Sequence, residues 1–258
     1  MFFLGAQERT KEGIGKGLDA RMMRAASGTR GNGETCSFFG AQERTKEGIG
    51  KGLDVLMKQA GIEGGGFMYY HASPIGGIKI LEPRISNHGV PLIYFSKKRE
   101  NVLVYLSNAI EKYCRETGFQ YSGVWKKWGP YGFDKNGLQR IEEYYPNALK
   151  TAYQGVSGYI YAAQSIAEAD FDLQIPDAAV SASPVPVSAC EFIPDAYTAI
   201  LQAEQDGLIT ILRYENLPDK MKAWNRRVIL EEYAEAADHP EYRHFLKGNF
   251  PDILSNER

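Results

Sequence analysis

The chain has 258 residues, 43% hydrophobic and 24% charged, which is the composition of a globular protein. Thirty Lys and Arg against 32 Asp and Glu give a net charge of -2, so overall charge does not predict a polyanionic partner such as DNA or RNA. The three cysteines, Cys36, Cys114 and Cys190, share no CxxC spacing, which argues against a disulfide framework or a zinc site and favours a reducing compartment. Because no apolar run approaches the length of a membrane span, we expect a cytoplasmic protein.

The N-terminal part contains a perfect duplication. The sequence GAQERTKEGIGKGLD occupies residues 5–19 and again residues 40–54. Two copies are too few for a stacked solenoid, so a local duplication is the simpler explanation. We expect residues 1–63 to form a helical or poorly ordered appendage and residues 64–258 to form one folded domain.

The first half of this domain alternates strand and helix signals. Aromatic and apolar runs bounded by Gly or Pro predict strands at residues 67–70 and 91–95. Apolar residues spaced by three and four predict a single helix over residues 100–116, closed by Gly118. The aromatic and glycine-rich residues 118–137 predict a hairpin or a compact loop.

The second half continues this mixed pattern. Residues 138–153 have a helical pattern interrupted at Pro146, and Asp195 is placed to cap a helix that follows it. The other predicted elements are a strand at 156–166, a loop with a short strand at 175–194, a strand at 208–215 and helices over 225–248. Strands and helices without regular βαβ alternation predict an α+β fold.

Common catalytic and metal motifs are missing from the sequence. No GxGxxG follows a strand, and neither GxxxxGK[ST] nor GxSxG occurs. His239 and His244 are separated by five positions across Pro240, a spacing that does not predict a metal site. The sequence therefore predicts no metal.

Two segments carry a resemblance to a known family. YHAS contains His71, Ala72 and Ser73 at the end of a predicted strand, and PLIYFSKK contains Tyr94 and Ser96 in the next strand, followed by the helical VLVYLSNAIEKY. This pair resembles the ADP-ribosyltransferase superfamily of the poly(ADP-ribose) polymerase, diphtheria-toxin and RNA 2'-phosphotransferase type. In that superfamily a strand-end histidine precedes a small residue and Ser or Thr, and a later strand carries a tyrosine in a pattern like GIYFA.

The resemblance implies a split antiparallel sheet sandwich with flanking helices and an NAD site without metal. His71 would bind the 2'-hydroxyl of the nicotinamide ribose and Tyr94 would stack on the nicotinamide ring. The other implied NAD contacts are Ser73, Arg84, Asn87 and Ser96. The alternative for His71 is a strand-end histidine bonded to the backbone, and the alternative for Tyr94 is a core aromatic residue.

The catalytic acid of the superfamily has no clear counterpart in this chain. Ser183 or Pro184 occupies the corresponding position, and Glu191 is the nearest carboxylate. Glu191 is therefore our candidate for the acid that would stabilise positive charge developing on the ribose, with a solvent-facing glutamate as the alternative.

The implied function is transfer of ADP-ribose from NAD to a macromolecular acceptor, or hydrolysis of NAD. The alternative is a catalytically inactive module of the same fold that contacts a protein or nucleic acid through residues 121–133. Within that segment Lys126 and Lys127 lie among aromatic residues, as in single-strand nucleic-acid binders. A phosphotransferase acting on a 2'-phosphate would need additional arginines that the sequence does not identify.

Overall fold

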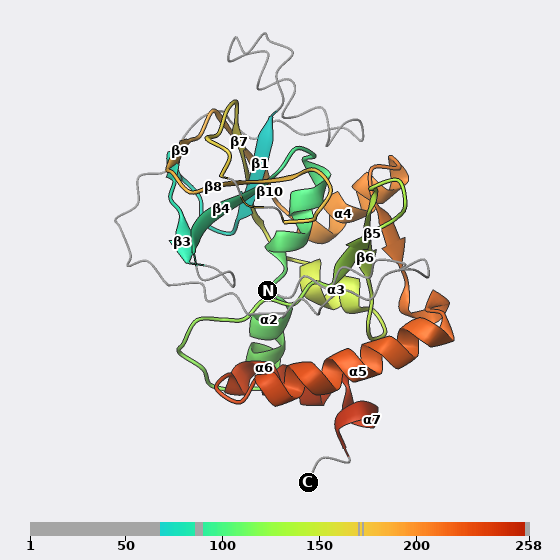
Figure 1. The fold of residues 1–258 in the computed structure, drawn as a ribbon. Coiled ribbons are helices and arrows are strands. Elements are labelled where there is room, and N and C mark those ends of the chain that lie inside the picture. The colour runs from blue at the N-terminus through green and yellow to red at the C-terminus, as the bar shows by residue number, and fades with distance from the viewer. Residues whose placement is uncertain (1–67, 86–89, 170, 172, 256–258) are drawn as a thin grey trace.

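The computed structural model describes residues 68–85, 90–169, 171 and 173–255 (Figure 1). The helical or poorly ordered appendage predicted for residues 1–63 lies outside these ranges. The described residues form mainly antiparallel sheets with several helices, which confirms the mixed character of the predicted α+β fold. No helix among the described residues is long and apolar enough to cross a membrane.

The largest sheet has six strands in the order β10-β7-β1-β4-β3, with β8 also pairing with β4 (Figure 1). Its strands are β1 (Tyr69–Ser73), β3 (Arg84–Ile85), β4 (Pro91–Ser96), β7 (Gly158–Ala163), β8 (Ala178–Ser181) and β10 (Ala189–Ile193). All pairs in this sheet are antiparallel. The predicted strands at 67–70, 91–95 and 156–166 correspond to β1, β4 and β7.

Two smaller sheets complete the strands. In the order β11-β6-β5, the second sheet contains β5 (Tyr131–Phe133), β6 (Gln139–Glu142) and β11 (Thr210–Leu212). The third contains β2 (Ile80–Leu81) and β9 (Val185–Pro186). The β11 and β6 strands run parallel, whereas the other two pairs are antiparallel.

The helices lie mainly around the second sheet and along the bottom of the view (Figure 1). They are the 3-10 helix η1 (Glu100–Leu106), α2 (Ala109–Glu116), α3 (Ala148–Tyr153), α4 (Ala196–Gln205), the 3-10 helix η2 (Tyr214–Asn216), α5 (Asp219–Glu235), α6 (Pro240–Asn249) and α7 (Pro251–Leu254).

Both faces of the large sheet pack against a hydrophobic core. Successive side chains of a strand point to opposite faces, so they enter different cores. On one face, which we call the η1 face, Ala72 and Ile160 belong to the main core together with Leu103 of η1. On the opposite face, Phe95 and Tyr161 belong to a second, smaller core. Neighbouring residues of one strand therefore belong to different environments.

The helix predicted over 100–116 is divided into η1 and α2. Ser107 and Asn108 separate the two helices, and the Ser107 hydroxyl donates to the carbonyl of Trp128. Serine and asparagine side chains compete for backbone hydrogen bonds, which disfavours a continuous helix here. Gly118 follows α2 with a φ of 72°, as expected for a glycine that ends a helix.

The helical prediction for residues 138–153 is correct only for its second part. Residues 139–142 form β6, which pairs with β5 across a turn in which Asp134 accepts hydrogen bonds from two backbone amides. Tertiary pairing therefore overrides the local helical pattern. We predicted a hairpin or compact loop within residues 118–137, and of the observed hairpin only β5 lies in that segment.

Asp195 caps α4, as the sequence predicts. Its carboxylate accepts from the backbone amides of Thr198 at 2.7 Å and Gly155 at 2.6 Å. We expect Asp195→Ala to lower the free energy of unfolding by about 1–2 kcal/mol, because both amides lose this partner. Urea denaturation measures the change, with the exposed Asp238→Ala as control. Equal effects of the two substitutions would contradict the capping role.

Candidate functional site

A small pocket lies at the end of β4, where the large sheet meets the β5–β6 hairpin and η1. It encloses about 220 Å³, counted to its open mouth. We call it the β4-end pocket, and its lining residues are Phe95, Ser96, Asn101, Tyr105, Tyr131, Phe133, Gln139, Ile175, Pro176 and Ala178. Because this figure includes open solvent, the enclosed space between the lining side chains is much smaller and holds about one water molecule.

Aromatic residues form much of the pocket wall. The hydroxyls of Tyr105 and Tyr131 are 2.9 Å apart, and their rings are perpendicular with centroids separated by 6.2 Å. Phe133 meets Tyr131 edge to face at 5.8 Å. Burial raises the pKa of Tyr105 and of Tyr131 far above the usual value, so both phenols stay neutral.

Two buried amide side chains give the pocket its polar character. Asn101 is 4% exposed and Gln139 is 1% exposed. Both side-chain atoms of the Asn101 amide, and Oε1 of Gln139, lack a hydrogen-bond partner within the described part of the chain. Buried polar atoms normally have partners, so these three require an explanation.

Two of the predicted NAD contacts lie on the η1 face near this pocket. Ser96 lines the pocket, and its hydroxyl accepts from the backbone amide of Lys98 at 3.1 Å. Phe95 points into the smaller core, so its neighbour Tyr94 points to the η1 face. The pKa of Tyr105 is raised mainly by burial, and the phenol of Tyr94 raises it further. Tyr94 and Tyr105 therefore lie on the same side of the sheet.

His71 lies on the opposite face of the sheet. Tyr70 pairs with Ser96, and the His71 ring meets Phe95 at 6.0 Å. Its Nδ1 donates to the carbonyl of Tyr94 at 2.9 Å, which is the backbone-bonded alternative that the sequence left open. Burial lowers the pKa of His71 despite this bond, so the ring is neutral at pH 7.

The expectation that His71 and Tyr94 line one slot is therefore wrong. His71 lies opposite Phe95 on the neighbouring strand, so these two side chains share a face. Tyr94 is the residue before Phe95 on β4, and its side chain therefore points to the other face. A ring bound against Tyr94 on the η1 face would be separated from His71 by the sheet itself.

Ser73 accompanies His71, whereas Arg84 pairs with Leu92, which has the same strand parity as Tyr94. Ser73 has the same strand parity as His71, and its hydroxyl accepts from the backbone amide of Ile75 at 3.1 Å. Arg84 is exposed, and its charge adds to the lowering of the His71 pKa, after burial. Asn87 lies outside the described residues. NAD contacts by His71, Ser73 and Arg84 stay predictions, and His71 and Ser73 lie on the face opposite Tyr94.

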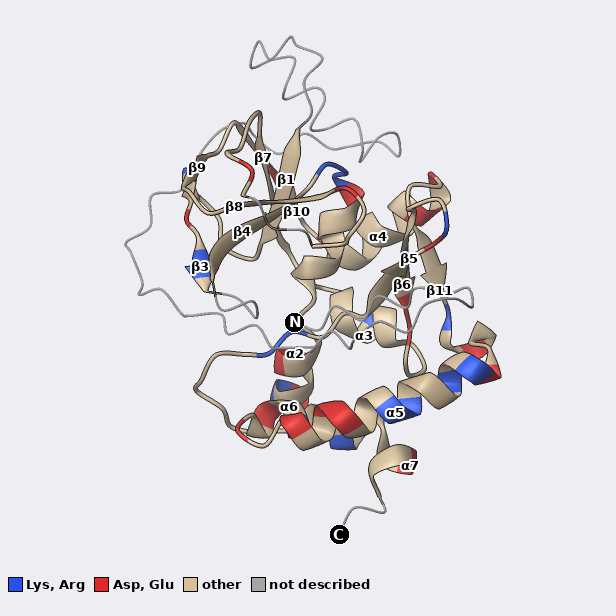
Figure 2. Ribbon diagram, viewed as in Figure 1, with Lys and Arg blue, Asp and Glu red and all other residues tan. Residues whose placement is uncertain are grey.

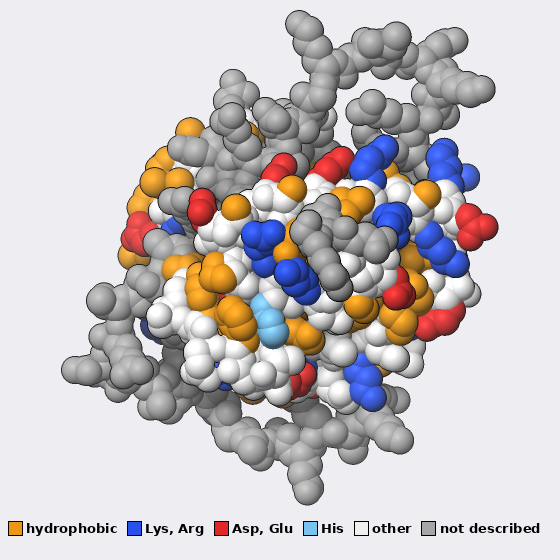
Figure 3. Space-filling model, turned by 90° about the horizontal axis from the view of Figure 1, so that it is seen from below, with side chains coloured by type: hydrophobic (Ala, Val, Ile, Leu, Met, Phe, Trp, Pro, Cys, Tyr) orange, Lys and Arg blue, Asp and Glu red, His pale blue; other side chains and the backbone are white. Residues whose placement is uncertain are grey.

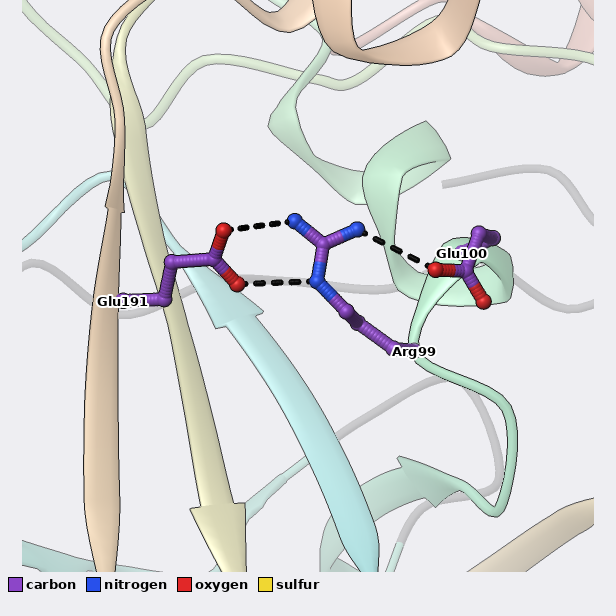
Figure 4. A network of polar contacts seen from close by, with 3 residues as sticks. All are labelled: Arg99, Glu100 and Glu191. Carbon is purple, nitrogen blue, oxygen red and sulfur yellow. Dashed lines mark hydrogen bonds and ion pairs between the residues drawn. The ribbon is translucent and has the colours of Figure 1, made fainter. Parts of the chain in front are cut away.

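Glu191 is neither a free acid nor solvent-facing. It is 6% exposed on β10, and both of its oxygens accept from Arg99, Nε and Nη2, at 2.8 Å (Figure 4). Arg99 also donates to Glu100 at 3.2 Å. Burial acts to lower the pKa of Arg99, but the two carboxylates raise it overall. The candidate acid is therefore held in a buried bidentate ion pair, an arrangement with strong geometric preference.

One of the two lysines of the aromatic segment 121–133 is buried and the other is half-buried. Lys126 is 5% exposed, and Lys127 donates to the carbonyl of Ser107 at 2.9 Å. Burial lowers the pKa of Lys127. On the molecule seen from below, basic side chains lie in separate groups among acidic and hydrophobic ones (Figure 3). Of the two charges that favoured nucleic-acid contact through this segment, that of Lys126 is therefore withdrawn from the surface and that of Lys127 is half-buried.

Apart from Ser96, no residue that builds the pocket was predicted individually from the sequence. Tyr105 stands in the helical VLVYLSN run and could have been found there, because this run follows the PLIYF strand directly. Asn101, Tyr131 and Gln139 carry no local signal, because distant parts of the chain bring them together. Within the described residues, no group of three or more His, Cys, Asp or Glu could hold a metal ion.

Comparison of the chain with protein-family models, curated proteins and solved structures finds no match.

Proposed function

We propose that this chain binds NAD and places the nicotinamide ring across the mouth of the β4-end pocket. The observation that carries the proposal is the group of aromatic rings there, in which Tyr131 meets Tyr105 and Phe133 edge to face. Aromatic walls with a few convergent polar groups are suited to a flat heteroaromatic ligand. Because the pocket itself holds about one water molecule, the ring would lie across its mouth and the remainder of NAD would lie outside it.

The choice of NAD rests on the resemblance to ADP-ribosyltransferases. β1 and β4 share a single residue pair, Tyr70 with Ser96. β1 pairs along its length with β7 instead, and β4 pairs with β8. This short junction between two better-paired groups of strands supports a split sheet. The resemblance adds transfer of ADP-ribose to a macromolecular acceptor, or NAD hydrolysis, as the reaction. The cytoplasmic location stays a prediction from the cysteine pattern.

Binding and turnover should be measured separately. Cleavage of NAD develops positive charge on the ribose, which a nearby carboxylate would stabilise. Glu191 is the predicted acid, but Arg99 occupies both of its oxygens. A protein that binds NAD without cleaving it, the inactive form of the same fold, is therefore compatible with this arrangement.

We expect NAD to bind the full chain in isothermal titration calorimetry, and Tyr105→Ala to weaken binding about tenfold or more. The substitution removes one aromatic wall of the pocket. The matched control is Tyr121→Ala, which removes a partly exposed tyrosine that packs against Trp125 in the aromatic segment. Circular dichroism checks that each variant is folded, and chromatographic detection of nicotinamide reports turnover.

Two results would overturn the proposal. The first is the absence of heat with NAD together with an unchanged melting temperature, because a ligand that binds only the folded state must raise that temperature. The second is NAD binding that Tyr105→Ala leaves intact in a folded variant, since the ring would then lie elsewhere.

A further inference from the structure

The large sheet ends on one side at β10. Within the described part of the chain, the only strand that pairs with β10 is β7, which runs antiparallel to it over Ala189–Ile193. Backbone N–H and C=O groups alternate between the two sides of a strand, so about half of those in β10 point away from β7. An edge of this kind is a template for pairing with another strand.

The sequence of β10 carries little protection against such pairing, which proteins usually prevent with charged residues, a proline or a bulge. The exposed side chains of β10 are Cys190 and Phe192, which are not charged residues, and its register with β7 is uninterrupted. Its one charged residue, Glu191, points over the sheet to Arg99 (Figure 4). An inward-pointing charge can protect an edge because pairing would bury it, but Glu191 is already buried and both of its oxygens accept from Arg99.

An aromatic patch adjoins this edge. Phe192 is 54% exposed, and its ring lies 5.2 Å from that of Tyr159 on β7. The backbone of Gly76 packs closely on the Tyr159 ring. The preceding residue, Ile75, is also 54% exposed, and its carbonyl accepts from the hydroxyl of Tyr161 on the same strand β7. These exposed apolar residues are therefore grouped beside β10, and grouped apolar residues are typical of interaction surfaces.

We propose that β10 pairs antiparallel with β10 of a second copy of this chain about a two-fold axis, which joins the two large sheets into one. In a symmetric pairing each strand meets its own sequence, so exposed charges would face like charges. β10 exposes none, and Arg99 balances Glu191 within each copy. A strongly acidic or basic partner would find no complementary charge on this edge. The inference does not depend on NAD binding.

The size of the contact predicts a weak dimer. The flanking Pro186 and Pro194 have no N–H to donate, which limits the pairing to the residues between them. One short strand and one aromatic ring from each copy bury less than the roughly 1,200 Å² at which standard interfaces begin, so we expect a Kd in the micromolar range.

Sedimentation velocity of the full chain with a reducing agent, at concentrations from about 1 to 200 µM, tests the proposal. We expect the sedimentation coefficient to rise with concentration toward that of a dimer. Phe192→Lys should raise the Kd at least about tenfold, because it places a lysine of each copy at the shared edge. The control is Ile85→Lys, at a 64% exposed position on β3 at the other end of the sheet, which should leave the Kd unchanged. Circular dichroism checks that each variant is folded.

Several results would overturn the proposal. One is a chain that stays monomeric over the whole concentration range, and another is an assembly larger than a dimer, because a two-fold contact closes with two copies. A dimer that a folded Phe192→Lys variant leaves intact, or that Ile85→Lys weakens equally, would have its contact elsewhere. Should Phe192→Lys not fold, Cys190→Lys places the same charge at the other exposed position of β10, with the same expected loss.

Discussion

Glu191→Ala should lower the free energy of unfolding by about 3–5 kcal/mol, because it leaves Arg99 buried without its principal partner. Arg99 is 8% exposed, and two of its three hydrogen bonds to carboxylates go to Glu191 (Figure 4). The remaining bond to Glu100 is longer, at 3.2 Å. Denaturation with urea at pH 7 measures the loss.

Two further variants establish the cause of this loss. The double substitution Arg99→Met with Glu191→Leu removes both charges, and we expect it to recover most of the stability. Glu231→Ala breaks an exposed ion pair with Arg227 and should change stability by less than about 0.5 kcal/mol. A Glu191→Ala variant as stable as Glu231→Ala would show that the buried pair contributes little.

The same position distinguishes a structural glutamate from a catalytic one. Arg99 directly precedes η1, which supplies Asn101 and Tyr105 to the pocket, so the ion pair ties this wall to β10. If Glu191 is structural, Glu191→Gln lowers the melting temperature and weakens NAD binding. If it is the acid, the variant keeps its stability and its NAD affinity and releases no nicotinamide.

The predictions that succeeded depend on local signals. The β1 and β4 strands come from short aromatic runs next to Gly or Pro, and the N-cap at Asp195 comes from one side chain acting on nearby amides. The strand at 139–142 was missed because its partner and the buried position of Ile141 are set by tertiary packing. The local sequence pattern alone cannot distinguish a segment that forms the predicted element from one, such as 139–142, in which tertiary packing selects a different element.

The candidate site was predicted only in part, because a sequence does not show which face of the sheet each side chain points to. A shift of one residue in the pairing of β1 with β4 would move His71 to the face of Tyr94. The motif therefore names two strands that do pair, but only β4 contributes residues to the β4-end pocket. Asn101 and Gln139 are brought together by the contact of η1 with β6, which no local pattern encodes.

A cluster of acidic residues lies where α5 meets α6. Acidic side chains gather at the C-terminal end of α5, whereas basic ones lie toward its beginning (Figure 2). Within this cluster Glu232 is 5% exposed and accepts from the hydroxyl of Tyr242 at 3.3 Å. Burial, followed by the charge of Glu235, raises the pKa of Glu232 to about 8, against the opposing effects of Tyr242 and Lys126.

This raised pKa predicts that Glu232 destabilises the fold as the pH increases. The folded state keeps the proton up to about pH 8, whereas the unfolded chain releases it near its ordinary pKa of 4.5. The stability that the protonated carboxyl supports is fully present below about pH 4.5, and it decreases by up to about 1.4 kcal/mol per pH unit as the pH rises to about 8. Glu232→Gln cannot ionise and avoids this decrease.

We therefore expect Glu232→Gln to become more stable relative to the unsubstituted chain as the pH rises, gaining about 3–4 kcal/mol between pH 5 and pH 8. Urea denaturation at four pH values in this range measures the difference between the two proteins, which removes the contributions of other titrating groups. The control is Glu231→Gln at the neighbouring, 64% exposed position, for which the difference should stay constant. A constant difference for Glu232→Gln as well would show that its carboxyl ionises in the folded protein at an ordinary pH, with the cluster at the junction of α5 and α6 open to water.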